Sequence, residues 1–285
     1  MASPPGYAVA LLLGAMLGSF ANVCILRIPA GASIVRPGSR CLSCGNPIAW
    51  YDNIPVFSYL LLRGRCRACR AQFSPRYMLV EAGMAMLAVA TYHHVTVAFE
   101  GAASPTYQLG LWGSYLLLEL VLVVLAFIDI DHRLIPDRIT WPAIPFFLLL
   151  GMALGELPWW DLLLGAALGY GVVRGISDGY YYLTKREGLG LGDGKLLAIV
   201  GGMFGWRGVL FSLLGGSLVG TLVGLPAVII SRARAQHTDQ QANEPNVSLR
   251  HVELPFGPFI VVAALAFLFL KENVAFRWWF LLGSQ

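Results

Sequence analysis

The chain has 285 residues, of which 57% are hydrophobic and only 13% are charged. Ordinary globular proteins carry about 25% charged residues, and disordered segments combine low hydrophobicity with high charge. This composition, with a mean hydropathy of +0.66, excludes a soluble enzyme and a disordered chain and indicates a membrane protein. The 32 glycines follow no triplet period, which excludes a collagen-like fibre. The net charge of +4 identifies no class of charged partner.

Apolar stretches long enough to cross a bilayer recur along the chain. A transmembrane helix needs about 20 apolar residues, and on that measure the sequence predicts an all-α, polytopic membrane helix bundle of about eight spans. The expected spans are 7–28, 77–99, 109–128, 140–154, 159–183, a pair within 195–231 that turns near 205–208, and 256–270, which could continue past Lys271. The fourth is short and contains Pro142 and Pro145.

Positive charge is unevenly distributed, which predicts the orientation of the spans. Arginines are concentrated in 27–76, where Asp52 is the one acid, and no Lys or Arg occurs between Arg76 and Arg133. Lys and Arg are enriched in cytoplasmic loops. The segments expected in the cytoplasm are therefore 29–76, 129–139, 184–194 and 232–255. Both termini are expected on the opposite side, and the first span lacks the basic start of a cleaved signal peptide. The polar stretch 235–253 is expected to be a flexible connection.

Four of the five cysteines form two Cys-x-x-Cys pairs in the loop 29–76, Cys41 with Cys44 and Cys66 with Cys69. Two such pairs can direct four thiolates at one tetrahedral zinc ion. The stretch between them is slightly longer than the usual about 15–20 residues, which a longer connecting loop absorbs. Disulfides are disfavoured in the reducing cytoplasm. We expect a structural zinc site, because four sulfur ligands leave no position for a water.

Two acids lie at the ends of apolar runs, where an ionisable group is costly. Asp129 directly follows the run 120–128, and Asp193 lies in the glycine-rich segment 188–194, just before another span. An Asp near the bilayer centre costs about 2.5–3.5 kcal/mol on insertion scales. Two carboxylates that meet from separate helices share a proton, so that one can activate a water while the other polarises a carbonyl. This pattern predicts aspartyl protease chemistry with Asp129 and Asp193 as the pair.

Other interpretations remain open on the residues alone. Asp131 and Asp137 belong to the same acidic loop as Asp129, and Asp137 or Thr140 could cap the following helix. The glycine run could be a simple turn, and it lacks the strand and the spacing of a dinucleotide-binding fingerprint. Glu119, within the third span, gives a transporter or channel its one point of support. A non-catalytic assembly factor that docks through the zinc loop is a third class.

The combination of motifs resembles the bacterial type IV prepilin peptidases, which belong to the GxGD intramembrane aspartyl proteases. The two segments that carry the resemblance are 129–137 (Asp-Ile-Asp-His-Arg-Leu-Ile-Pro-Asp) and 190–196 (Gly-Leu-Gly-Asp-Gly-Lys-Leu). Shorter matches extend it over nearly the whole chain, at 18–23, 27–29, the four cysteines, 52–55, 63–67, 80–81 and 255–258. Each short element is common by chance, whereas the composite is highly specific.

The resemblance implies a multi-pass enzyme of the bacterial inner membrane with its catalytic side in the cytoplasm. Members cut the short basic leader from type IV prepilins and type II secretion pseudopilins after a glycine, and then N-methylate the new N-terminal residue with S-adenosylmethionine. It implies Asp129 and Asp193 as the catalytic residues. No motif identifies the methyl-donor site, and Glu81 with the loop 29–76 is our hypothesis for it. The expected partners are these pilin substrates and the lipid bilayer, with no nucleic acid.

The resemblance also divides the chain into four segments. They are a first transmembrane helix (1–28), a cytoplasmic zinc-binding loop with the four cysteines (29–76), the second and third spans (77–128) and an aspartyl peptidase core with both catalytic aspartates (129–285). An arginine-rich loop would repel a basic leader, so Glu81, Asp52 and Asp131 are hypothetical partners for its lysines. A peptidase without methyltransferase activity is the nearest alternative, and a non-catalytic secretion or pilus assembly protein is a more distant one.

Overall fold

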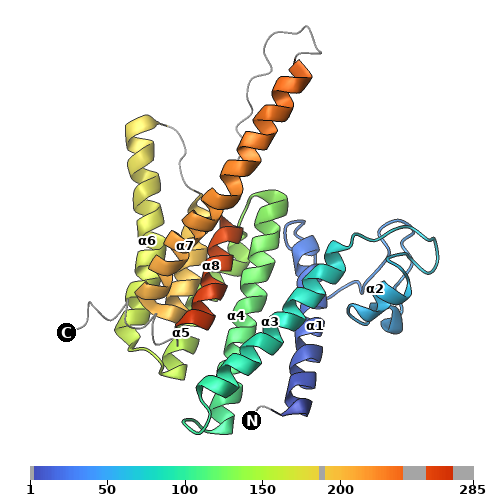
Figure 1. Cartoon of the computed structure of the whole chain (residues 1–285), viewed down its shortest axis with the longest axis horizontal. Helices are drawn as coiled ribbons and strands as arrows, with labels where there is room; N and C mark the ends of the chain where they lie inside the picture. The colour runs from blue at the N-terminus through green and yellow to red at the C-terminus, as the bar shows by residue number, and fades with distance from the viewer. Residues whose placement is uncertain (1–2, 186–189, 240–254, 272–285) are drawn as a thin grey trace.

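The computed structural model describes residues 3–185, 190–239 and 255–271, and its regular secondary structure is helical throughout (Figure 1). The helices are α1 (Pro4–Arg27), α2 (Phe57–Leu61), α3 (Arg76–Ala98), α4 (Pro105–His132), α5 (Asp137–Leu154), α6 (Trp159–Thr184), α7 (Leu191–Asp239) and α8 (Gly257–Leu270), with a short 3-10 helix, η1, at Trp50–Asn53. For these described ranges, the prediction of an all-α fold is confirmed.

Local sequence signals determine where the long helices begin and end. The side chain of Ser3 accepts a hydrogen bond from the N–H of Gly6 ahead of α1, and Ser104 accepts one from Tyr107 ahead of α4. A proline follows each cap, in the first turn, where the missing N–H would have had no helical partner. α4 ends at Arg133, which adopts the left-handed conformation common at helix C-termini.

Four described helices are long and apolar enough to cross a membrane, namely α1, α4, α5 and α7 as far as Pro226. α8 is apolar but spans only 14 residues. α3 and α6 are not among the four, and they pack along α1 and α7 respectively. The chain is thus a multi-pass membrane protein, and the total of about eight spans stays a prediction.

α7 contains the predicted turn. Gly205 has a φ of 69°, a left-handed conformation that interrupts the helix. Ahead of this residue α7 packs against α6, with Gly165 against Gly201. Beyond it α7 turns back and packs against α8, with Gly216 against Ile260. The two halves of α7 therefore form a hairpin of helices, and the glycines allow this hairpin to pack closely against α6 and α8.

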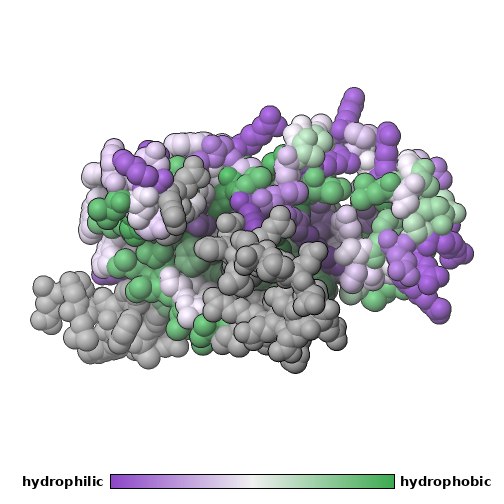
Figure 2. All heavy atoms as spheres, turned by 90° about the horizontal axis from the view of Figure 1, so that it is seen from above, coloured by the Kyte–Doolittle hydropathy of each residue, from purple (hydrophilic) through white to green (hydrophobic). Residues whose placement is uncertain are grey.

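One end of the bundle gathers the charged segments. α1 and α3 run antiparallel, with Gly18 against Glu81, so α1 ends where α3 begins. α4 ends beside the start of α8, where Asp129 contacts Gly257. The connection 28–75, here called the cysteine lobe, lies at this end beside α1, at the right of Figure 1. Seen from this end, at the right of Figure 2, its surface mixes hydrophilic and hydrophobic side chains.

The connecting segments differ in part from the prediction. The cysteine lobe has little regular structure besides η1 and α2, as expected for it. α7 continues as a helix to Asp239, so the start of the connection predicted at 235–253 is helical, and the rest of it lies outside the described residues. An extension of α8 beyond Lys271 also lies outside them.

Candidate active site and metal centre

Asp129 lies in the last turn of α4, because this helix continues past the predicted boundary to His132. Only 7% of its surface is exposed. Its Oδ2 accepts a hydrogen bond of 3.0 Å from the N–H of Gly257, the first residue of α8. A Cβ at Gly257 would lie 2.7 Å from that oxygen, so only glycine fits there without a shift. α8 thus orients the Asp129 carboxylate from a position far along the chain.

Asp193 lies in the first turn of α7 and is half-buried. The packing of the neighbouring residues brings it toward Asp129, which comes from a separate helix. Ile135 packs between the elements that carry them. A Cβ at Gly192 would lie 2.8 Å from its Cβ, and a Cβ at Gly257 would lie 3.4 Å from its Cδ1. Two neighbouring carboxylates retain one proton between them, which is the arrangement that an aspartyl protease uses.

The other acids of this region are paired with basic residues. Asp131 accepts a hydrogen bond of 2.6 Å from Arg76, and Asp137 forms an ion pair with Lys195. Asp137 does not cap α5, whose N-cap is Pro136 and has no side-chain hydrogen bond. The two aspartates of the candidate pair, in contrast, make no ion pair with any described residue. Asp129 and Asp193 therefore differ from Asp131 and Asp137, whose charges are neutralised by a basic side chain.

Glu119, the acid that would support a transporter, joins two helices. It is fully buried in α4 and receives a hydrogen bond from the Thr91 hydroxyl of α3. Acids on an ion pathway face a water-filled cavity or the interior of a transport path. A carboxyl that is closed off from water between α3 and α4 therefore favours a packing role.

The four cysteines of the lobe come together in space. Their sulfur atoms all lie within 4.8 Å of one another, and the Sγ atoms of Cys41 and Cys69 are 3.8 Å apart. Four sulfurs at about 2.3 Å from a zinc ion in a tetrahedron are about 3.8 Å apart. The backbone N–H groups of Cys44 and Ser43 lower the pKa of the Cys41 thiol to about 6. Despite the N–H of Ala71, burial and the neighbouring thiols raise the pKa of Cys69 to about 11, so Cys41 is the thiol that ionises first for a metal. The residues present therefore fit a four-sulfur zinc site.

Each cysteine pair sits on a turn of the same design. The N–H of Gly45 donates to the carbonyl of Cys41, and the N–H of Arg70 donates to the carbonyl of Cys66. Gly45 and Arg70 both have positive φ, 73° and 63°. Few residues of the lobe are buried. A metal bound by both turns would supply the cohesion that a hydrophobic core supplies elsewhere.

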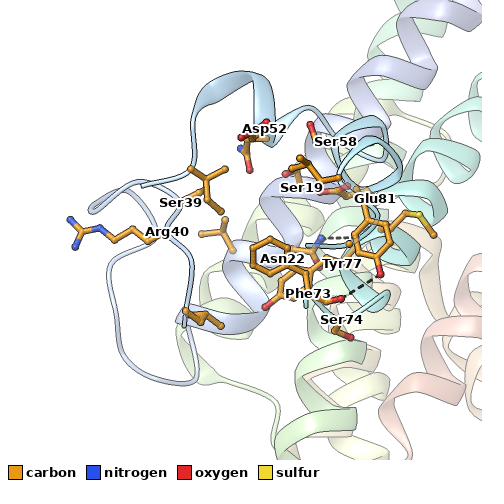
Figure 3. A pocket seen from close by; sticks show the side chains of 18 of the residues that line it. Ser19, Asn22, Ser39, Arg40, Asp52, Ser58, Phe73, Ser74, Tyr77 and Glu81 are labelled. Carbon is orange, nitrogen blue, oxygen red and sulfur yellow. Dashed lines mark hydrogen bonds between the residues drawn. The ribbon is translucent and has the colours of Figure 1, made fainter. Parts of the chain in front are cut away.

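A cavity of about 600 Å³ opens between the cysteine lobe and the ends of α1 and α3 (Figure 3). Asn22 of α1 donates a 2.9 Å hydrogen bond to the carbonyl of Tyr77 on α3. Glu81, one turn further along α3, accepts a 2.7 Å hydrogen bond from the N–H of Val56 in the lobe. Ligand pockets commonly measure about 300–1,000 Å³ and contain a few polar groups. Asn22 was not predicted as a site residue, although an Asn inside an apolar span is unusual enough to signal one.

Asp52 also lines the cavity, but its charge is matched. Arg67 donates to both of its carboxylate oxygens, at 2.8 and 2.6 Å, and this contact lowers the pKa of Asp52. Asp131 likewise has an arginine partner. Of the three acids suggested as partners for leader lysines, Glu81 is therefore the one without an ion pair among the described residues.

Two protein-family models match this chain. The bacterial peptidase A24 N-terminal domain matches residues 12–95, which include the four cysteines and Glu81. The type IV leader peptidase family matches residues 116–225, which include Asp129 and Asp193. No solved structure matches the chain.

Curated relatives with the same kind of name align with most of the chain. A protein from Myxococcus xanthus is 38% identical over 85% of this chain and 69% of its own length. One from Aeromonas salmonicida is 32% identical over 96% of this chain and 93% of its own, and one from Pseudomonas aeruginosa is 31% identical over 89% and 86%. All three are named prepilin leader peptidase/N-methyltransferase. The chain belongs to the type IV leader peptidase family.

Proposed function

We propose that this protein is a membrane-embedded aspartyl peptidase that removes the leader from type IV prepilins and pseudopilins, cutting after a glycine, and then N-methylates the new N-terminal residue. Membership of the type IV leader peptidase family and the names of the relatives support both activities. The observation that carries the peptidase assignment is the convergence of Asp129, at the end of α4, and Asp193, at the start of α7, on the packing around Ile135.

The two carboxylates divide the work of hydrolysis. Asp129 receives the N–H of Gly257, whereas no described residue donates a hydrogen bond to the Asp193 side chain, so we assign the shared proton to Asp193. Asp129 takes a proton from a water, whose oxygen attacks the scissile carbonyl carbon, while Asp193 donates its proton to the carbonyl oxygen. Collapse of the tetrahedral intermediate breaks the C–N bond. The amine leaves with the proton held by Asp129, and one hydroxyl of the intermediate returns a proton to Asp193.

In this proposal the cut is made at the cytoplasmic face of the bacterial inner membrane. Basic residues at the ends of spans favour the cytoplasmic side. Arg27, Arg76 and Arg133 lie at the ends of helices on the same side of the bundle as the aspartates. This distribution supports a catalytic site that opens toward the cytoplasm.

The cysteine lobe supplies a second site. Cys41, Cys44, Cys66 and Cys69 would hold a zinc ion with a structural role, because four sulfur ligands leave no open position. The chemistry of the adjoining cavity suits S-adenosylmethionine, which supplies an electrophilic methyl group when bound. The lining residues that offer aromatic surface to its adenine or positive charge to its carboxylate are Tyr59, Phe73, Tyr77, Arg27, Arg40 and Arg65.

Cleavage of a purified prepilin in liposomes tests the peptidase assignment. Asp129→Asn and Asp193→Asn should each lower kcat for leader removal by about 10²–10⁴-fold, because each removes a proton-transfer group. N-methylation of a pilin cut beforehand should persist in both. Asp131→Asn is the matched control, because it removes a neighbouring charge that is already paired, and it should cleave at close to the wild-type rate. Normal cleavage by either of the first two variants would reject the assignment.

A further inference from the structure

The cavity of Figure 3 contains a carboxylate that the peptidase chemistry does not use. Besides Glu81, the charged or titratable groups that line it are Asp52, Arg27, Arg40, Arg65, Tyr59 and Tyr77. Arg67 neutralises Asp52, so the unmatched charges around Glu81 are positive. Within the described lining, Glu81 is therefore the group that can attract a cation.

Glu81 is held by one backbone hydrogen bond and by the packing of α1 against α3. Its Oε2 accepts the N–H of Val56 at 2.7 Å, and Ser19 of α1 lines the cavity beside it (Figure 3). A Cβ at Gly18 would lie 2.6 Å from the Glu81 Cα, so the backbones of α1 and α3 are in direct contact there. Val56 has a φ of 61°, a conformation that β-branched residues rarely adopt and that is found most often at functional sites. The carboxylate is thus preorganised within the cavity.

N-methylation of a peptide N-terminus requires a neutral amine. An α-amino group has a pKa of about 7.7–8.0, so at pH 7 most of it is protonated and has no free lone pair. A carboxylate beside the ammonium can first bind it and then accept its proton. Because only about a tenth of such an amine is neutral at pH 7, removal of its proton by a carboxylate raises the rate about tenfold.

We infer that Glu81 binds the new N-terminal ammonium group of the cut pilin and removes the proton that blocks its methylation. This inference rests on the proposed function, in which the same cavity holds the sulfonium donor. One proton passes from the nitrogen to the Glu81 carboxylate. The freed lone pair forms the N–C bond to the donor methyl group, and the S–C bond breaks with its electron pair retained by sulfur. The products are a methylated ammonium, a neutral thioether and a protonated Glu81, which then releases its proton to water.

Glu81→Gln tests this role, because the Gln amide oxygen can still accept the Val56 N–H. With the purified full-length protein and a pilin cut beforehand, kcat for methylation should fall about tenfold at pH 7, because only about a tenth of the amine is neutral there without a base. It should recover by up to about tenfold per pH unit toward pH 8, because the amine then loses its proton unaided. The binding of S-adenosylhomocysteine, the unreactive product of the donor, should match the wild type. Glu119→Gln, a buried glutamate outside the cavity, is the matched control and should methylate normally.

Three results with Glu81→Gln would overturn the inference. Methylation at the wild-type rate would show that no base is needed from Glu81. Loss of S-adenosylhomocysteine binding would make Glu81 a ligand of the donor. A loss of methylation that is equal at every pH would make its role structural. A separate variant tests the donor site itself. Asn22→Trp should fill the cavity and abolish the binding of S-adenosylhomocysteine, while leader cleavage is retained. If that variant still binds S-adenosylhomocysteine, the donor lies elsewhere.

Discussion

The candidate peptidase site and the cavity beside the cysteine lobe are built in different ways. The two aspartates stand at the ends of the long helices α4 and α7, and α8 provides the backbone contact to Asp129. The cavity takes its walls from the ends of α1 and α3 and from a lobe with few buried residues. Helix packing therefore maintains the first site, whereas four cysteines and a metal would maintain the second. This difference implies that the two activities can be lost separately.

Removal of the metal is expected to separate the two activities most strongly, with methylation lost and leader cleavage retained. Structural zinc in small domains contributes an apparent binding free energy of about 10–16 kcal/mol, which is also folding free energy. Replacing Cys41 and Cys66 by Ser should abolish zinc in the purified protein, measured by elemental mass spectrometry, together with N-methylation. Leader cleavage should persist. Cys24→Ala, a cysteine of α1 outside the cluster, should keep zinc and both activities. Loss of cleavage with the metal would show that the lobe also supports the aspartates.

The opposite result, with leader removal reduced and methylation retained, is expected from Gly257→Ala. The new Cβ would lie 2.7 Å from the Asp129 Oδ2, so the carboxylate or α8 must move. Misplacement of a catalytic group by about 1 Å can cost 10²-fold in rate. We expect kcat for leader removal to fall by up to that factor while methylation of a cut pilin is unchanged. Gly110→Ala on α4 is the control, because its Cβ would meet nothing within 4 Å. Equal losses in both variants would contradict the proposed role of Gly257.

A moderate loss of stability is expected from overpacking the contact between α6 and α7. A Cβ at Gly165 would collide with the backbone at Gly205, where α7 turns. Overpacking of this kind costs about 1–3 kcal/mol, so Gly165→Ala should lower the thermal unfolding midpoint and reduce cleavage at elevated temperature before methylation. Gly171→Ala, also on α6, would meet no atom within 4 Å and should melt like the wild type. An unchanged midpoint for Gly165→Ala would contradict the close packing of α6 and α7.

The smallest effect is expected from the ion pair that joins the two regions. Arg76 begins α3 beside the cavity, and Asp131 lies two residues beyond Asp129. Their side chains are 35% and 28% exposed, and such pairs contribute about 0.2–1 kcal/mol. A double-mutant cycle with Arg76→Gln and Asp131→Asn should give a coupling free energy of unfolding in that range, with both activities near wild type. A much larger coupling would show that the two regions fold as one tightly joined unit.

Features with local signals could be predicted from the sequence, whereas contacts between distant segments could not. The position of Asp129 after an apolar run and the glycines around Asp193 identified the pair as a candidate, and the cysteine spacing identified the cluster. The contact of Asp129 with Gly257 joins residues 128 positions apart, and no local pattern indicates it. The boundary of α4 was predicted too early, because polar residues after an apolar run resemble a loop even where the helix continues.

The cavity was not predicted, because it too depends on contacts between distant segments. Its walls come from three segments that are separate in the sequence, and of its charged residues Glu81 and Asp52 were suggested in advance as binding residues. Asn22 and Tyr77 become neighbours only because α1 and α3 pack antiparallel through Gly18 and other small residues. Hydrophobic periodicity predicts that two such helices exist, but it does not determine which of their faces meet.

The central claim is that Asp129 and Asp193 act as one catalytic unit. The most direct test compares kcat for leader removal in Asp129→Asn, Asp193→Asn and the double variant, with methylation of a cut pilin as the internal control. Residues that act as a unit have strongly non-additive effects, so we predict that the double variant cleaves about as slowly as either single variant while all three still methylate. Losses that multiply in the double variant, or cleavage at the wild-type rate by either single variant, would contradict the claim.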